Sequence, residues 1–151
     1  MEQGGTAPDF ELDDQTGTRR RLGDLLVAGP VVLFFFPIAS SNGCTAEACR
    51  FRDLADAFAG TGATVVGCSP DEVGTQRQFA DAHSLDFPLL ADPDGVVAAQ
   101  FGVKRSGLLG KVGPVQRRTF VIEQDRTVRT VVTGERKPRH HADDALAALR
   151  D

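Results

Sequence analysis

The chain has 151 residues, of which 41% are hydrophobic and 25% are charged, and we predict a single domain over residues 1–151. A formal net charge of -4 and the absence of Tyr and Trp argue against nucleic-acid binding, which uses basic and aromatic side chains. The strongest apolar run, residues 31–36, is far shorter than the roughly 20 residues that span a bilayer, so no membrane partner is expected.

Two features predict a soluble cytoplasmic protein. Residues 1–9 are polar and acidic, without the basic start and apolar stretch of a secretion signal. The cysteines, Cys44, Cys49 and Cys68, are too few for the disulfide scaffold of a secreted domain. In a reducing compartment, two cysteines five positions apart are more often reactive or metal-binding than structural. The cysteines and histidines lack the spacing of a zinc site, so no metal is expected.

Hydrophobic and turn patterns predict strands that alternate with helices. The β-branched and aromatic run at 31–36 is typical of a central strand buried on both faces. The expected elements are a hairpin from residue 9, a helical turn or two at 22–27, strand 31–36, helix 44–59, strand 63–69, helix 71–82, strand 87–91, helix 94–101, a glycine-rich loop at 104–114, a hairpin of 117–122 with 127–133, and helix 141–149. Their order predicts an α/β fold with a mixed central sheet flanked by helices and an N-terminal hairpin.

Cys44 is the candidate nucleophile. Pro37 ends the buried strand and fixes the direction of the chain, a small polar loop follows, and the predicted helix begins at Cys44. A thiol in the first turn of a helix faces unpaired backbone N–H groups and the positive end of the dipole, and both favour the reactive thiolate. Ser41, three residues earlier, either presents its hydroxyl to the thiolate and substrate or caps the helix.

The spacing Pro37-x-x-x-Ser41-x-x-Cys44 resembles the active-site motif of peroxiredoxins. Residues 43–53, with Cys49 five positions after Cys44, resemble the subgroup called peroxiredoxin Q or bacterioferritin comigratory protein. The resemblance covers nearly the whole chain, and its further landmarks are residues 7–10, 66–71, 87–92, 101–103 and 117–122.

This resemblance implies a thioredoxin-like fold and a thiol peroxidase. Cys44 would attack hydrogen peroxide or an organic hydroperoxide, Cys49 would capture the resulting sulfenic acid as an intramolecular disulfide, and thioredoxin or a similar dithiol would reduce it. The family's active-site Arg stands three positions before Phe120, which selects Arg117. Its guanidinium keeps its proton and can hold a thiolate while polarising a peroxide. The resemblance implies no metal, haem or flavin, and a monomer or weak dimer.

The loop before Cys44 departs from the family pattern. The family usually has Thr-Pro-Gly before the cysteine, where this chain has Ser41-Asn42-Gly43. Serine keeps the hydroxyl but lacks the methyl group that helps to fix the rotamer, and loss of the proline loosens the loop. We therefore expect retained activity from a less sharply organised loop.

The cysteine spacing predicts a helix that opens. Residues five apart in an α-helix have Cα atoms roughly 8.6 Å apart, given a rise of about 1.5 Å per residue and a radius of about 2.3 Å. A disulfide needs less than about 7 Å. Cys44 and Cys49 can therefore bridge only if the first turn of the helix unwinds.

Other polar residues have structural interpretations. Cys68, within an apolar strand, is expected to be a small buried hydrophobe. Glu47 suits the first helical turn, where a negative charge is favoured, and Arg118 is either an outward neighbour of Arg117 or a second partner for Glu47. His140 and His141 adjoin a predicted helix start and are expected to be solvated.

Alternative functions remain open at this stage. A thioredoxin-type thiol–disulfide oxidoreductase is disfavoured because Cys-x-x-Cys is absent. A peroxide-sensing redox switch would use the same disulfide as the peroxidase, so the residues do not separate the two. Peroxide preference is expected to depend on a pocket formed by Ile38, Ala39 and the 104–114 loop.

Overall fold

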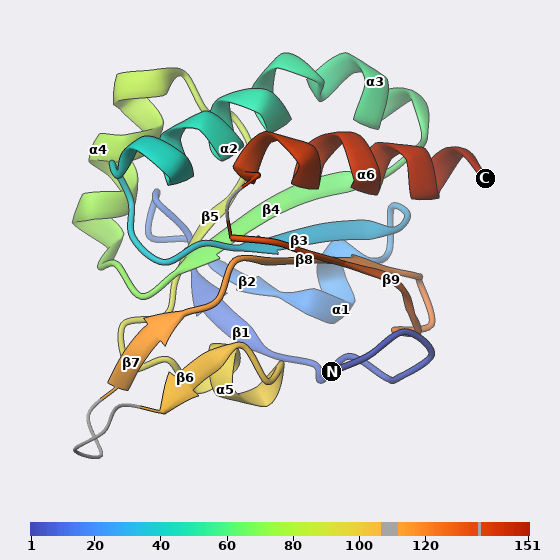
Figure 1. Ribbon diagram of the computed structural model, residues 1–151, viewed down its shortest axis with the longest axis horizontal. Coiled ribbons are helices and arrows are strands. Elements are labelled where there is room, and N and C mark those ends of the chain that lie inside the picture. The colour runs from blue at the N-terminus through green and yellow to red at the C-terminus, as the bar shows by residue number, and fades with distance from the viewer. Residues whose placement is uncertain (107–111, 136) are drawn as a thin grey trace.

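The computed structural model in Figure 1 describes residues 1–106, 112–135 and 137–151. Within these residues the chain forms a five-stranded sheet in the order β5-β4-β3-β8-β9. Its strands are β3 (Val31–Phe35), β4 (Thr64–Ser69), β5 (Leu89–Ala91), β8 (Arg118–Ile122) and β9 (Val128–Thr133). β3 pairs in parallel with β4 and antiparallel with β8, so the expected mixed sheet is confirmed.

Helices cover both faces of this sheet (Figure 1). They are α1 (Leu22–Leu25), α2 (Asn42–Asp53), α3 (Ala55–Gly60), α4 (Val73–His83), α5 (Val96–Gln100) and α6 (Pro138–Arg150). α2, α3, α4 and α6 pack on one face, while α1 and α5 lie on the other beside the N-terminal hairpin of β1 (Glu11–Asp13) and β2 (Arg19–Arg21). α6 runs along α2 and also contacts β8 and β9, so the end of the chain covers the helix that carries Cys44.

The alternation of side chains along β3 divides the core into two layers. Val31, Leu33 and Phe35 point into the layer under α1 and α5. Val32 and Phe34 point into the opposite layer, which also holds Cys44 of α2. Every side chain of β3 is fully buried, as predicted for a central strand with both faces covered. Cys44 therefore belongs to the core layer that includes Val32 and Phe34 of β3.

The element boundaries correct the sequence predictions at three places. The helix expected at 44–59 begins two residues earlier and is interrupted at Leu54, which separates α2 from α3. The glycine-rich segment expected to be a loop is flanked by two short paired strands, β6 (Lys104–Ser106) and β7 (Val112–Val115), and residues 107–111 lie outside the described residues. The final helix begins at Pro138 rather than at residue 141, because proline suits the first turn.

No helix among the described residues combines the length and the apolar character that crossing a membrane requires.

Candidate active site

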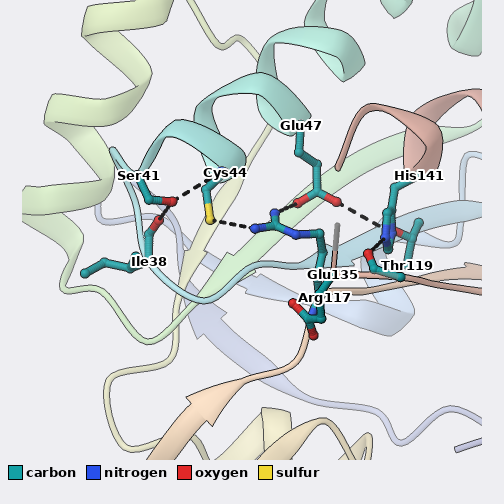
Figure 2. Close-up of polar contacts among 9 residues, drawn as sticks. Ile38, Ser41, Cys44, Glu47, Arg117, Thr119, Glu135 and His141 are labelled. Carbon is teal, nitrogen blue, oxygen red and sulfur yellow. Dashed lines mark hydrogen bonds and ion pairs between the residues drawn. The ribbon is translucent and has the colours of Figure 1, made fainter. Parts of the chain in front are cut away.

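Cys44 lies in the first turn of α2, directly after the loop that leaves β3. Its side chain is buried, and its backbone N–H donates to Ser41 Oγ across 3.3 Å. The same hydroxyl donates to the carbonyl oxygen of Ile38 at 3.3 Å (Figure 2). Ser41 is therefore the N-cap of α2, the second of the two roles considered for it.

The loop before α2 is held in a defined conformation. Ser40 has φ of 70°, a left-handed conformation that non-glycine residues adopt infrequently. The Ala39 backbone N–H donates to an Asp71 carboxylate oxygen at 2.7 Å, which ties the loop to the end of the neighbouring strand β4. Pro37 is half-buried between β3 and this loop, and Ile38 remains 55% exposed. An exposed apolar side chain therefore lies in the loop that leads to the buried Cys44.

Arg117 brings a positive charge to Cys44 from the segment that leads into β8. It lies immediately before β8, and its side chain is only 7% exposed. One guanidinium nitrogen, Nη2, is 3.5 Å from Cys44 Sγ, and the other, Nη1, donates to Glu47 Oε1 at 2.7 Å (Figure 2). Burial opposes the charge of Arg117, but Glu47 and Cys44 outweigh it and raise the pKa of Arg117 above its ordinary value. Arg117 remains a cation beside the sulfur.

Gly43 allows this close approach. A Cβ atom at position 43 would lie 3.1 Å from Arg117 Nη2 and 4.0 Å from Pro138 Cγ. The residue before Cys44 must therefore be small for the guanidinium to reach the sulfur in this position. The backbone N–H of Arg117 is held in turn by Glu135 Oε1 at 2.8 Å.

Glu47 was interpreted from the sequence as a charge that suits the first helical turn, and this was wrong. Its side chain is fully buried and forms an ion pair with Arg117, not with Arg118, which is half-buried. Burial raises the pKa of Glu47 to about 8, although the charge of Arg117 works against the rise. Helical spacing contained the missing signal, because position 47 shares a face with the buried Cys44 and Phe51.

His141 was expected to be solvated, and this was also wrong. Its ring is buried, with Nδ1 2.8 Å from Thr119 Oγ1 and Nε2 2.8 Å from the Gly134 carbonyl oxygen. Nδ1 also lies 3.5 Å from Glu47 Oε2. The prediction failed because α6 begins before His141, which places the ring on the inner face with Ala145. His140, by contrast, is exposed as predicted.

Comparison with known proteins identifies the family. The sequence model of the AhpC/TSA family matches residues 3–131. The chain belongs to the AhpC/TSA family. The crystal structure of peroxidoxin BcpB from Mycobacterium tuberculosis is similar over 99% of this chain and 97% of that one, with a TM-score of 0.96 and 59% identity.

Two further relatives place this peroxiredoxin near the Q subgroup. The chloroplast peroxiredoxin Q of Sedum lineare is 36% identical over 98% of this chain and 77% of its own length. The Xanthomonas campestris bacterioferritin comigratory protein has a TM-score of 0.85 and 29% identity over 93% of this chain and 90% of that one. The peroxiredoxin is therefore a thiol peroxidase with the expected thioredoxin-like fold.

Cys49 of this peroxiredoxin lies on α2 but faces away from the buried cluster. It is half-buried and lines a pocket of about 410 Å³ between α2 and α6. The pocket is lined by Ala46, Cys49, Arg50, Asp53, Arg139, His140 and Asp143. Arg50 and Asp143 form an ion pair of 2.7 Å from one helix to the other. Cys44 and Cys49 are both free thiols, and an intact helix runs through both positions.

Cys68 plays the structural part that the sequence predicted. It lies on β4 with its side chain fully buried, and it packs in the layer that does not contain Cys44. Burial and the nearby Asp92 raise the pKa of the Cys68 thiol well above its ordinary value. A neutral thiol in the core of this peroxiredoxin does not supply a nucleophile.

Proposed function

We propose that Cys44 is the peroxidatic residue of this enzyme and that Arg117 stabilises its charge. The observation that carries the proposal is the 3.5 Å contact between Arg117 Nη2 and Cys44 Sγ, at the buried start of a helix. The thiolate sulfur attacks the terminal oxygen of the hydroperoxide and the O–O bond breaks. The leaving oxygen takes a proton and departs as water or an alcohol, and Cys44 becomes a sulfenic acid. The guanidinium offsets negative charge as that bond breaks.

The proposal assigns Cys49 as the resolving residue. Its sulfur attacks the sulfenic sulfur of Cys44, a disulfide forms, and the hydroxyl leaves as water with the thiol proton. Because both residues lie in the intact helix α2, this step requires α2 to unwind locally. Thioredoxin or a similar dithiol then reduces the disulfide and is itself oxidised. The open pocket beside Cys49 gives the reductant a route to this sulfur.

The proposed substrates are hydrogen peroxide and organic hydroperoxides. The support is the exposed apolar side chain of Ile38, in the loop that leads to Cys44, which offers an alkyl group an apolar surface. The Xanthomonas campestris relative is described by its alkyl peroxide reduction activity, which agrees with this assignment.

The test counts peroxide consumed by the fully reduced protein, with and without a dithiol reductant. Cys44→Ser should abolish consumption, whereas Cys49→Ser should consume one equivalent and then stop. Cys68→Ser is the matched control and should turn over like the wild type, because that thiol is buried in the other core layer. Consumption by Cys44→Ser would contradict the assignment of the nucleophile, and normal recycling of Cys49→Ser would contradict that of the resolving residue.

A further inference from the structure

Three buried polar side chains extend the active site behind Arg117. Thr119 of β8, His141 of α6 and Glu47 of α2 are each fully buried (Figure 2). The ring of His141 is fixed at both nitrogens. The carbonyl oxygen of Gly134 can only accept a hydrogen bond, so His141 Nε2 carries a proton that it donates across 2.8 Å. In the neutral ring Nδ1 is then an acceptor, and the Thr119 hydroxyl donates to it across 2.8 Å.

This tautomer directs an acceptor toward a carboxyl oxygen that lacks a partner. Glu47 Oε1 is bound by Arg117, but the buried Oε2 has no hydrogen-bond partner among the described residues. Its neighbour is His141 Nδ1, 3.5 Å away. Nδ1 has a single lone pair, so the Thr119 hydroxyl and the hydrogen of a protonated Glu47 compete for it. That lone pair attracts the hydrogen of a protonated carboxyl group but destabilises a charged carboxylate oxygen.

We propose that His141 is a positioning residue that holds a proton on Glu47, so that the positive charge of Arg117 remains available to the Cys44 thiolate. The inference rests on the proposed function only in taking Cys44 as the nucleophile. When Glu47 is neutral, Arg117 and the Cys44 thiolate form a buried cluster with no net charge. When Glu47 is ionised, the same cluster carries a net negative charge, which a buried site disfavours.

The surrounding charges are consistent with this assignment. Burial lowers the pKa of His141 and raises that of Glu47, so each group prefers its neutral form. Arg117 acts in the same direction on His141, whereas Glu135 and Asp144 act against it. On Glu47, Arg117 favours the charged form and Glu135 the neutral one. Burial is the largest influence on both side chains and favours the neutral form of each, and the Nδ1 acceptor of His141 favours the same form of Glu47.

The first test reads the proton positions directly, without peroxide. Nitrogen NMR of the histidine rings should show His141 protonated on Nε2 and unprotonated on Nδ1 at neutral pH. Carboxyl-carbon NMR, with the Glu47 signal assigned by its loss in Glu47→Gln, should show a protonated Glu47 at the same pH. A proton on His141 Nδ1, or an ionised Glu47 at neutral pH, would overturn the proposal.

The second test measures how this proton affects Cys44. The readout is the pH midpoint of thiolate formation, followed by ultraviolet absorbance with Cys49 and Cys68 replaced by Ser. His141→Phe keeps a ring but removes the acceptor that favours protonated Glu47, so a larger fraction of Glu47 is ionised and competes with Cys44 for Arg117. The midpoint should rise by about one pH unit, so at any pH well below it the fraction of Cys44 in the thiolate form should be about tenfold smaller. Circular dichroism verifies that each variant is folded.

Two matched variants separate proton holding from packing. Thr119→Val removes the competing donor but leaves Nδ1 facing Glu47, so the midpoint should stay at or below the wild-type value. In a Glu47→Gln background the side chain is permanently neutral, so adding His141→Phe should leave the midpoint unchanged. A rise in Thr119→Val, or an equal rise from His141→Phe in both backgrounds, would identify a packing effect and overturn the proposal. If the NMR and titration results were as expected but the wild type did not reduce peroxide, the proposed function would be contradicted and not the role of His141.

Discussion

Replacing Gly43 by alanine should make the protein more stable and less active. An added Cβ would lie 3.1 Å from Arg117 Nη2 and 3.9 Å from Cζ, so the guanidinium must move by a few tenths of an ångström. The same nitrogen contacts Cys44 Sγ at 3.5 Å, so a shift of the guanidinium away from position 43 weakens its interaction with the sulfur. The same substitution should stabilise α2, because alanine in a helix is favoured over glycine by up to about 1 kcal/mol.

The expected rate constant for peroxide reduction is about tenfold below the wild-type value, a partial loss of one charge-stabilising donor. Stopped-flow peroxide reduction gives the rate, and denaturant unfolding gives the free energy of unfolding. Gly74→Ala is a matched control, because Gly74 is also the second residue of a helix, α4, and an added Cβ there meets nothing within 4 Å. If Gly43→Ala reduced peroxide as fast as Gly74→Ala, the close approach of Arg117 would not matter for catalysis.

Two further changes test the charges around α2. Burial raises the pKa of Glu47 from 4.5 to about 8. Between these two pH values the folded state therefore holds a proton that the unfolded chain releases. The free energy of unfolding of the wild type should therefore fall between about pH 5 and pH 8, by up to about 1.4 kcal/mol per pH unit. Denaturant unfolding of Glu47→Gln should show a flatter dependence on pH. Equal slopes for the two proteins would contradict a protonated Glu47. Asp143→Asn removes the ion pair with Arg50 that joins α2 to α6, so disulfide formation at Cys49 should become roughly twofold faster by quenched alkylation and mass spectrometry. A slower reaction would mean that this pair does not restrain the opening of α2.

The sequence predicted the parts of the site that lie close together in the chain. Pro37, Ser41 and Cys44 occupy one loop and one helical turn, and a local motif therefore determines their arrangement. The alternation of strands and helices predicted the mixed sheet, because each pattern has its own period and the buried run at 31–36 could only be central. Arg117 was selected by resemblance, and the structure brings it to the sulfur.

The parts that failed depend on contacts between distant segments. Nothing near Glu47 in the sequence shows that Arg117, 70 positions later, donates a hydrogen bond to its buried carboxyl group. The prediction that His141 is solvated followed from its polar ring. It was wrong because the ring lies on the inner face of α6, where its partners are Thr119 and Gly134. Sequence periodicity indicates that such positions face inward, but it does not identify the group that satisfies a buried polar atom.

The packing of α6 on α2 has a consequence for folding. The hydrogen bonds from Arg117 to Glu47 and to Cys44 span 70 and 73 positions, and the bond from Thr119 to His141 adds a segment from the last helix. Contacts between residues so far apart close large loops, which makes them slow to form relative to local structure. Arg117 lies 73 positions after Cys44, so a chain that is still being synthesised carries Cys44 before its cation. We expect the contact between Arg117 and Cys44 to form when β8 pairs with β3, and the contacts of His141 to complete the site when α6 packs on α2.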